Sequence, residues 1–262
     1  MKKQKIFLIR DENYDAFTNM AIDEFLFFKS IKENKIFFRL YGWARPSISI
    51  GYFQDIERYF DVSKLEKKNI PLVRRITGGR GVYHGRELTY SFTMSRQCFS
   101  PFQKKEIFQF ISSLFQRAFA LLDLKTTVQL HSTEKKNKTG NCFRSASEFE
   151  LISDYAKLVG SAQYISDNGV LQQGSIPLSS DIDKLNYFLK GNIFDESIYP
   201  LKFEQKSHLI NAIVEVCSRD FPLENFNFSA EDFEKIVKIK KNKYQLKAWN
   251  WFRQKTDTRQ EI

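Results

Sequence analysis

Residues 74–84 read RRITGGRGVYH, and residues 88–92 follow with LTYSF. Both ends of this stretch have the apolar and β-branched character of strands, and the glycines between them permit the positive φ angles of a tight turn. A glycine turn leaves backbone N–H groups accessible, and arginines and a histidine make its surroundings cationic. The stretch therefore predicts strand, glycine turn and strand. Two interpretations stay open, a binding loop for an anionic or carbonyl-bearing ligand and a plain hairpin tip with surface arginines.

The composition is that of a folded protein without a membrane segment. The 262 residues are 42% hydrophobic and 15% aromatic, which suffices for one large core or two modest ones and excludes a disordered chain. No run of about 18 apolar residues appears, and charges from Arg10 onward interrupt the N-terminal apolar run too early for a signal peptide. We therefore expect a soluble, cytoplasmic protein.

Cysteine and histidine are too few and too scattered for a disulfide framework or a metal centre. The three cysteines form no C-x-x-C pair, and the three histidines are spread along the chain, so we expect no metal site. Cys217 falls on the apolar side of a predicted helix, and Cys98 is expected to be a second structural thiol. Cys142 differs from both, because it ends a polar, turn-rich segment over 132–141 that is expected to be an exposed, mobile loop.

The net charge of +10 comes largely from two lysine-rich segments. One is 135–138, in the polar loop, and the other holds six lysines between Lys235 and Lys247, which are typical of the solvated side of a helix. No RNA-binding signature or zinc finger accompanies them, and we expect neither a nucleic acid nor a membrane as partner. An acidic protein is at least as good an explanation, because complementary charge raises encounter rates.

Hydrophobic periodicity predicts the helices and strands that surround the glycine stretch. Apolar residues at helical spacing predict helices over 15–32, 61–69, 102–122, 181–189, 207–216 and 229–252. Alternating residues predict strands over 36–41, 47–50, 126–130, 149–153, 157–165 and 170–178. Local signals support three of these elements, namely Ser100-Pro101 as a helix start, Asn168-Gly169 as a hairpin turn, and Ser229 with Asp232 as a capping box.

With these elements placed, the sequence resembles the biotin/lipoate protein ligase superfamily, which includes lipoate–protein ligases and octanoyltransferases. The glycine stretch is similar to that superfamily's R-R-x-[ST]-G-G-[GR]-x-V-x-H signature. Further similar motifs follow in the family's order, NMAIDE at 19–24, YGW at 41–43, SIGYFQ at 49–54, KLVGSAQ at 157–163, LQQGSI at 171–176, and KY with AWN at 243–250. The resemblance covers nearly the whole chain. It implies an α+β fold of mixed β-sheets flanked by helices, with a catalytic domain over 1–200 and a helical C-terminal extension over 201–262.

Two features favour the LipM-type octanoyltransferases within this superfamily. Arg80 stands at the third position of the glycine run, where the ATP-dependent ligases usually carry glycine. Cys142 falls where that branch has its nucleophilic cysteine, and Lys157 lies downstream where the family's lysine is expected. Gly85 and Ala156 depart from the family pattern, in which an aspartate and a glycine are usual. Neither departure removes a reacting group, but both leave the details of substrate recognition open.

The resemblance implies transfer of an octanoyl group from acyl carrier protein to a lysine of a lipoyl-carrier protein such as the glycine cleavage H protein. A thioester is already activated, so this reaction needs no ATP, metal or other cofactor. Cys142 would form an acyl thioester, and Lys157 would lower the pKa of that cysteine and polarise the acyl carbonyl. Thioester exchange preserves the activation of the acyl group for the second half-reaction.

A substrate-binding set is implied by the same resemblance. Backbone N–H groups of 78–81, or those of Gly160 and Ser161, would donate to the oxyanion. His84 would either orient the acceptor lysine or fill a strand face, and Gly174 with Ser175 would close the pocket by tight packing. The complete set is Arg75, Thr77, Gly78, Gly79, Arg80, Gly81, Tyr83, His84, Gly160, Ser161, Ala162, Gly174 and Ser175.

Three other functions stay open. A lipoate–protein ligase would use Lys157 and the glycine loop to hold an acyl adenylate, would need ATP and Mg²⁺, and would leave Cys142 incidental. An amidotransferase would move octanoyl between lipoyl domains, also through a cysteine. A non-catalytic binding module would dock its basic C-terminal helix on a nucleic acid or an acidic protein, and Cys142→Ala would then have no effect.

Overall fold

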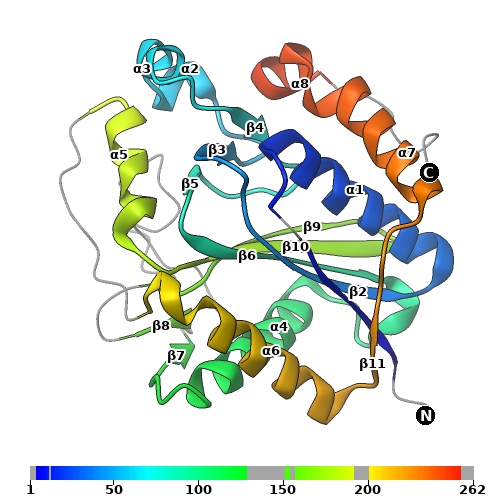
Figure 1. Cartoon of the computed structure of the whole chain (residues 1–262). Coiled ribbons are helices and arrows are strands. Elements are labelled where there is room, and N and C mark those ends of the chain that lie inside the picture. Colours follow the sequence, from blue (N-terminus) through cyan, green and yellow to red (C-terminus); the bar gives the residue numbers. More distant parts are fainter. Residues whose placement is uncertain (1–3, 12, 129–150, 154–156, 192–200, 255–262) are drawn as a thin grey trace.

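A six-stranded mixed sheet forms the centre of the computed structural model, which describes residues 4–11, 13–128, 151–153, 157–191 and 201–254 (Figure 1). The strand order is β11-β1-β2-β6-β10-β9. Strand β1 pairs in parallel with β2 and β11, whereas β2, β6, β10 and β9 pair antiparallel in succession. The bounds are β1 Ile6–Arg10, β2 Ile36–Tyr41, β6 Glu87–Ser95, β9 Gly160–Ile165, β10 Gly169–Pro177 and β11 Leu223–Asn225.

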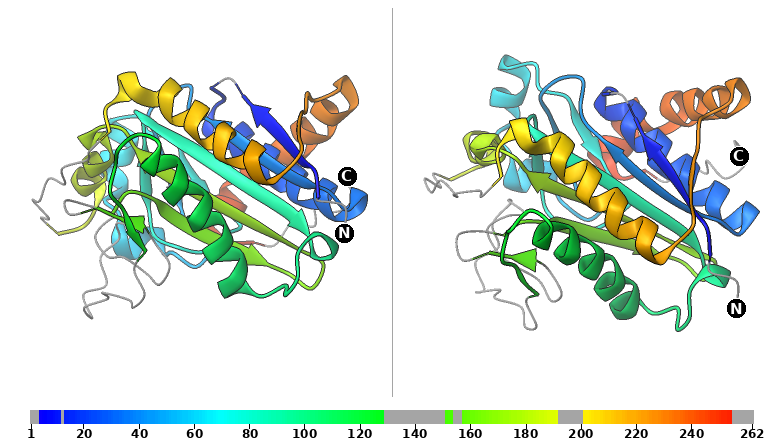
Figure 2. Two further views of the ribbon diagram at one scale, coloured as in Figure 1. Left: turned by 90° about the horizontal axis from the view of Figure 1, so that it is seen from below. Right: turned by 60° about the horizontal axis from the view of Figure 1, so that its bottom comes forward.

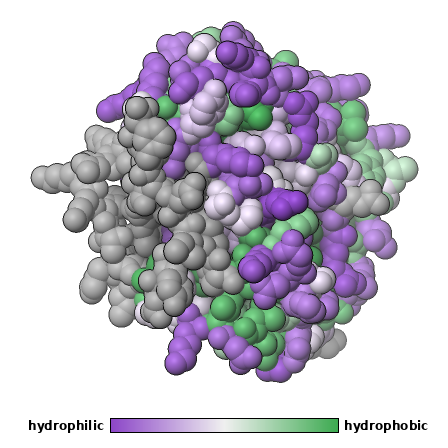
Figure 3. All heavy atoms as spheres, turned by 60° about the vertical axis from the view of Figure 1, so that its left-hand side comes forward, coloured by the Kyte–Doolittle hydropathy of each residue, from purple (hydrophilic) through white to green (hydrophobic). Residues whose placement is uncertain are grey.

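Helices cover both faces of this sheet (Figures 1 and 2). On one face lie α4 (Lys104–Ala120) and α6 (Lys206–Asp220), which pack on each other and on the largest apolar cluster. On the other face lies α1 (Ala16–Glu33), with α7 (Ala230–Ile239) and α8 (Lys247–Phe252) beside it. In Figure 3, hydrophobic side chains gather low, at the level of α4 and α6, while the upper part of the view is mainly hydrophilic. The predicted α+β class, with mixed sheets flanked by helices, is confirmed.

A second sheet at one end of the large one carries the glycine stretch. Its order is β4-β3-β5, with β3 at Ser47–Ile50, β4 at Leu72–Arg74 and β5 at Val82–His84. Around it pack α2 (Ile56–Tyr59), α3 (Val62–Lys67) and α5 (Leu185–Phe188). Strand β4 leads into the glycine turn and the predicted strand at 88–92 lies within β6, but the short strand β5 comes between them and was not predicted. Strands β4 and β5 each pair with β3 rather than with each other. The hairpin-tip interpretation is therefore wrong, because the turn crosses over β3.

Most of the other predicted elements are confirmed. Asp15 caps α1 by accepting hydrogen bonds from the N–H groups of Phe17 and Thr18, and Ser229 and Asp232 form the predicted capping box of α7. Antiparallel β9 and β10 close through the turn at Asn168-Gly169. Two-residue strands β7 (Thr127–Val128) and β8 (Leu151–Ile152) form a separate pair, and 3-10 turns span Arg96–Cys98, Ser180–Lys184 and Phe203–Gln205.

Two predicted helix boundaries are wrong. Helix α4 begins at Lys104 with Gln103 as its N-cap, because the N–H of Gln103 first closes a turn on the carbonyl of Pro101. The last predicted helix is interrupted after Ile239 by a π-helical turn over Lys240–Tyr244. Within that turn Lys243 is buried against Glu24, so the prediction that this lysine is solvated is also wrong.

Residues 201–254 join the large sheet and its core. Strand β11 forms the sheet edge beside β1, and Leu209, Ile213 and Cys217 of α6 are buried in the main apolar cluster. The predicted boundary between residues 200 and 201 stays a prediction. No helix in the described ranges is long and apolar enough to cross a bilayer.

Candidate functional site

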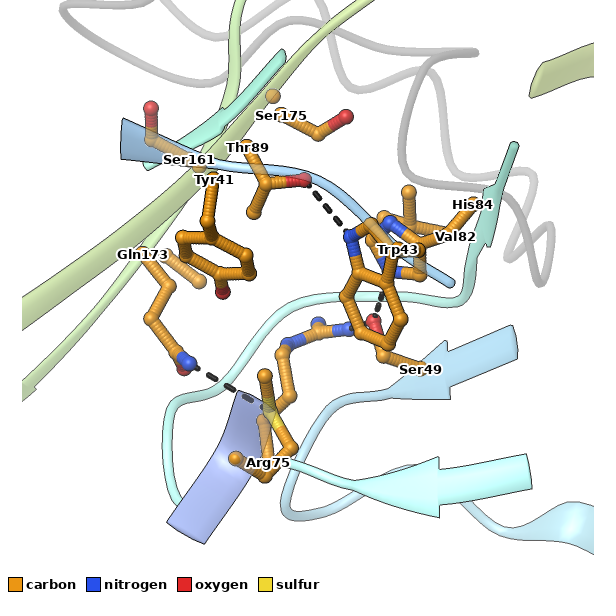
Figure 4. A pocket seen from close by; sticks show the side chains of 14 residues that line it. Tyr41, Trp43, Ser49, Arg75, Val82, His84, Thr89, Ser161, Gln173 and Ser175 are labelled. Carbon is orange, nitrogen blue, oxygen red and sulfur yellow. Dashed lines mark hydrogen bonds between the residues drawn. The ribbon is translucent and has the colours of Figure 1, made fainter. Parts of the chain in front are cut away.

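A recess lies where the two sheets meet, and side chains from both sheets and from α1 surround it (Figure 4). Its cavity volume is about 30 Å³, and about 360 Å³ of space lies within it and in front of it when open solvent is included. The lining residues are Met20, Tyr41, Trp43, Ser49, Arg75, Val82, His84, Thr89, Gly160, Ser161, Ala162, Gln173, Gly174 and Ser175.

Predicted site residues from distant parts of the sequence meet in this recess. The antiparallel register of β9 and β10 places Ser161 opposite Gly174 and Gly160 opposite Ser175. Arg75 and His84 enter from the second sheet, at the two ends of the glycine stretch. The recess therefore joins the glycine stretch to the β9–β10 hairpin.

Glycine is required at two places around the recess. A Cβ on Gly174 would lie 2.2 Å from a ring carbon of Tyr90, so β10 can pack on that ring only without a side chain. Strand β10 is therefore tightly packed against Tyr90 at this position, whereas the predicted role of Gly174 in closing the pocket stays a prediction. Gly79 has a φ of +88°, in the left-handed region that the glycine turn was predicted to need.

Arg75 fixes the shape of the glycine turn from inside. Its side chain donates to the carbonyl oxygens of Gly78 and Arg80 at 3.0 Å each and to the hydroxyl of Ser49 at 2.6 Å. Because the guanidinium holds the carbonyl side of the turn, the turn is organised before any ligand arrives. A Cβ placed on Gly78 would have no heavy atom within 4 Å, so open space lies beside this part of the turn.

His84 is held between Ser49 and Glu87 at one end of the recess. Its Nε2 lies 2.6 Å from Ser49 Oγ and its Nδ1 lies 2.8 Å from Glu87 Oε1, while its ring stacks on Trp43 at 3.7 Å. Since Ser49 accepts from Arg75, its own proton is directed at Nε2, which assigns the imidazole as the neutral Nδ1–H tautomer. Burial lowers the pKa of His84 and outweighs the opposing effect of Glu87.

A buried network lies behind the recess and reaches the glycine stretch. Gln173 Nε2 donates to Asp23 Oδ2 at 2.6 Å, and Gln173 Oε1 accepts from Thr77 Oγ1 at 2.8 Å. Asp23 also accepts from Arg39 Nη1 at 2.8 Å and from Tyr41 Oη at 2.9 Å. Sequence reasoning missed Asp23 and Gln173 as site residues. The quoted motifs NMAIDE and LQQGSI contain them, but nothing in their spacing shows that they meet.

The remaining predicted residues are spread around the site. Thr77 reaches the recess through Gln173, while Tyr83 stacks on Phe188 in the apolar cluster of the second sheet. Gly81 is buried and Arg80 is partly exposed. Lys157 is buried and lies three residues before β9, and its backbone forms an isolated antiparallel β-bridge with Ile152. It is not among the described residues that line the recess. Cys142 and the predicted loop over 132–141 lie outside the described residues.

The two described cysteines behave as structural thiols. Burial in the core raises the pKa of the Cys217 thiol to about 12. Burial also raises the pKa of Cys98, although this residue is only partly buried. Because the thiolate is the nucleophilic form, neither environment is that of an activated cysteine.

Comparisons of the sequence and of the fold with known proteins identify relatives over nearly the whole chain. The family model of the lipoyl protein ligase A/B catalytic domain matches residues 15–227. Among curated proteins, the octanoyltransferases LipM of Bacillus anthracis and Bacillus subtilis are each 31% identical, covering 96% and 97% of this chain and 99% and 100% of their own length. LipM of Clostridioides difficile is 32% identical over 93% of this chain and 97% of its own.

Solved structures show the same fold at lower sequence identity. Lipoate-protein ligase A bound with ATP superposes with a TM-score of 0.76 at 19% identity, covering 96% of this chain and 99% of its own. A bipartite lipoate protein ligase from Thermoplasma acidophilum gives 0.75 at 18% identity, covering 98% and 99%. Since the family model and the curated relatives span most of the chain, this protein belongs to the lipoyl protein ligase A/B catalytic-domain family.

Proposed function

We propose that this protein is an octanoyltransferase of protein lipoylation, which moves an octanoyl group from acyl carrier protein to a lysine of a lipoyl-carrier protein of the glycine cleavage H type. The observation that carries the proposal is the recess between the glycine turn and the β9–β10 hairpin, in a chain similar over nearly its whole length to octanoyltransferases. Its walls combine apolar contact surface with polar groups that are already bonded to one another, which suits an acyl chain.

The proposed reaction has two half-reactions through Cys142. The thiolate of Cys142 attacks the carbonyl carbon of the octanoyl thioester, a tetrahedral oxyanion forms, and the carbon–sulfur bond to the carrier breaks. The carrier thiol leaves with a proton, and octanoyl remains on Cys142 as a thioester. The neutral amine of the acceptor lysine then attacks this thioester, an amide forms, and Cys142 is released.

Other residues have supporting roles in this proposal. Lys157 would stabilise the thiolate and polarise the acyl carbonyl. The backbone N–H groups of 78–81 would donate to the oxyanion, a role that the ordering of this turn by Arg75 supports. Neutral His84, with its ring fixed on Trp43, would orient the acceptor lysine. The reaction would take place in the cytoplasm, without ATP or a metal ion.

Intact mass spectrometry tests the acyl-enzyme. The purified protein and a Cys142→Ala variant are incubated with octanoyl-acyl carrier protein in the absence of ATP. We expect one octanoyl adduct on the wild type, released by hydroxylamine, and none on the variant. If the wild type takes no octanoyl group but lipoate with Mg-ATP yields lipoyl-AMP, the protein is a ligase and the proposal fails.

The charge of the chain adds a second test. Acyl carrier and lipoyl-carrier proteins are typically acidic, and a net charge of +10 would steer them toward the enzyme. Because salt screens such steering, kcat/KM for both carriers should fall severalfold between about 50 and 300 mM salt. A flat salt profile would remove the electrostatic argument without touching the assignment of Cys142.

A further inference from the structure

The polar side chains around the recess are, with one exception, hydrogen-bonded within the protein. Tyr41 donates to Asp23 and Trp43 donates to Thr89, and the hydroxyl of Ser161 lies 2.8 Å from that of Tyr90. Ser49, Arg75, His84 and Gln173 are bonded as described above. The recess therefore offers an incoming ligand few unused polar side-chain atoms.

The exception is the hydroxyl of Ser175. This side chain lines the recess and is 3% exposed, and its Oγ has no hydrogen-bond partner within the described structure (Figure 4). A buried hydroxyl without a partner is unfavourable, and such groups are uncommon in folded proteins. On the same face of β10, two residues away, Gln173 uses both of its amide atoms. On this face of β10, the hydroxyl without a partner therefore occurs at Ser175 and not at Gln173.

The position of Ser175 decides which part of a ligand it meets. It pairs with Gly160 at the start of β9 and with Thr89 of β6, toward the end of β10 where Lys157 precedes β9. An acyl thioester has one polar group, its carbonyl, and an apolar chain. We propose that the Ser175 hydroxyl donates a hydrogen bond to the acyl carbonyl oxygen and to the oxyanion that develops from it. This role rests on the proposed function, since it concerns the same acyl substrate.

Single-turnover kinetics test the inference directly. Octanoyl-acyl carrier protein is mixed with excess enzyme, and adduct formation is compared for the wild type and Ser175→Ala. We expect the variant to react about 100-fold more slowly, the loss typical of removing one oxyanion donor. An unchanged rate overturns the inference. If the wild type itself forms no adduct, the proposed function fails, which is a different result.

Thermal stability separates this role from a structural one. Removing an unpartnered hydroxyl should leave Tm unchanged or raise it. The matched control is Ser91→Ala on β6, because the Ser91 hydroxyl is buried and donates to Asp23 at 2.7 Å, so its removal should lower Tm. A fall in Tm for Ser175→Ala comparable to that of Ser91→Ala would mean that Ser175 supports the fold, and would overturn the inference.

A substrate analogue removes the other partner of the proposed hydrogen bond. In S-octyl-acyl carrier protein, a methylene group replaces the carbonyl, so Ser175 has nothing to donate to. Its inhibition constant should be the same for the wild type and Ser175→Ala, although their rates with the octanoyl thioester differ. If Ser175→Ala weakens binding of the S-octyl carrier to the same extent, the side chain shapes the apolar pocket and does not bind the carbonyl.

Discussion

Asp23 and Glu24 are neighbours on α1, and each is buried with one cation and one tyrosine, yet they organise different parts of the molecule. Asp23 binds Arg39 and Tyr41 of the large sheet. Glu24 accepts from Lys243 Nζ at 2.8 Å and from Tyr244 Oη at 2.5 Å, both in the π-helical turn. Consecutive helical residues point about 100° apart, so one helix supplies a carboxylate to each region.

The two regions differ in how they reach the recess. The Asp23 region extends through Gln173 to the glycine stretch. Beyond the π-helical turn, α8 binds the end of β4, which leads into the glycine stretch. Trp249 Nε1 donates to the carbonyl oxygen of Arg74 at 3.0 Å, and the backbone N–H of Arg74 donates to Asn250 Oδ1 at 2.9 Å. One carboxylate thus supports the recess, and its neighbour supports the attachment of the C-terminal helices.

Both tyrosines act as hydrogen-bond donors. Burial raises the pKa of Tyr41 well above its usual value, and the negative charge of Asp23 raises it further. Burial and Glu24 act in the same way on Tyr244. For Arg39, burial alone would lower the pKa, but Asp23 and Asp11 outweigh that effect and raise it. Arg39 stays charged and the phenols stay neutral, so the loss of Asp23 removes one of the two carboxylates that compensate a buried cation.

Asp23→Ala should have the largest effect. It leaves the fully buried guanidinium of Arg39 with Asp11 as its remaining carboxylate partner and removes the acceptor of Tyr41, Ser91 and Gln173. We expect a loss of about 3–5 kcal/mol in the free energy of unfolding and no octanoyl transfer. Urea unfolding and the single-turnover assay check both parts. A stable and active Asp23→Ala protein would show that the network behind the recess is dispensable.

Glu24→Gln should have the next largest effect, and on stability alone. It leaves Lys243 buried with a neutral partner, and we expect a loss of about 2–3 kcal/mol. Single-turnover transfer at low temperature should stay close to that of the wild type, since Glu24 does not line the recess. The double variant Glu24→Leu/Lys243→Met should regain part of the lost stability, because no unpaired charge remains. Equal losses of transfer activity in Glu24→Gln and Asp23→Ala would erase the functional distinction between the regions.

Gln173→Leu should have a smaller effect on stability, because it cuts the connection between Asp23 and Thr77 without leaving a buried charge unpaired. The hydroxyl of Thr77 loses its acceptor, and we expect a loss of about 1–2 kcal/mol. Octanoyl transfer should fall about tenfold through kcat, because the glycine turn is less well fixed. If kcat is unchanged and only Tm falls, the network stabilises the fold without positioning the turn.

Sequence patterns predicted the elements well but not the buried ion pairs. The first helix, the β9–β10 hairpin and the positive φ within the glycine turn follow from local spacing and residue type. Asp23 and Glu24 lie off the apolar stripe of α1, where local periodicity predicts solvated side chains. Their cations are 16 and 219 positions away, and only the tertiary fold brings them together.

In the candidate site, too, the segments could be predicted from the sequence but the buried polar contacts between them could not. The resemblance selected residues on the glycine stretch and on β9 and β10, and the fold brings several of them to one recess. The alternation of β6 would suit a strand with one solvated face, yet Thr89, Ser91 and Thr93 are buried under α1. A polar residue facing a covering helix and one facing water give the same sequence pattern. Lone hydroxyls and carboxylates of this network therefore could not be identified before the fold was known.

The smallest predicted effect is a pH dependence of stability that arises from His84 in the recess. Burial holds the pKa of His84 below its usual 6.5, so between the folded-state pKa and 6.5 the unfolded chain binds more protons than the folded one. The stability that neutral His84 contributes is complete above pH 6.5 and is lost as pH falls through this window. Burial and Glu24 raise the pKa of Tyr244 well above its usual value, so this phenol stays neutral throughout the window.

Tm measured from pH 8 to pH 5 for the wild type and His84→Gln isolates this contribution, because other titrating groups are shared and cancel in the difference. The difference in Tm should shrink as the pH falls below 6.5, since only the wild type loses stability through residue 84. Acid should also weaken octanoyl transfer in the wild type, because a protonated imidazole can no longer accept from Ser49 and would disturb the Ser49–Arg75 contact. A difference in Tm that grows on acidification would mean that Glu87 holds His84 as an imidazolium, and that the recess is built around an ion pair as the Glu24 region is.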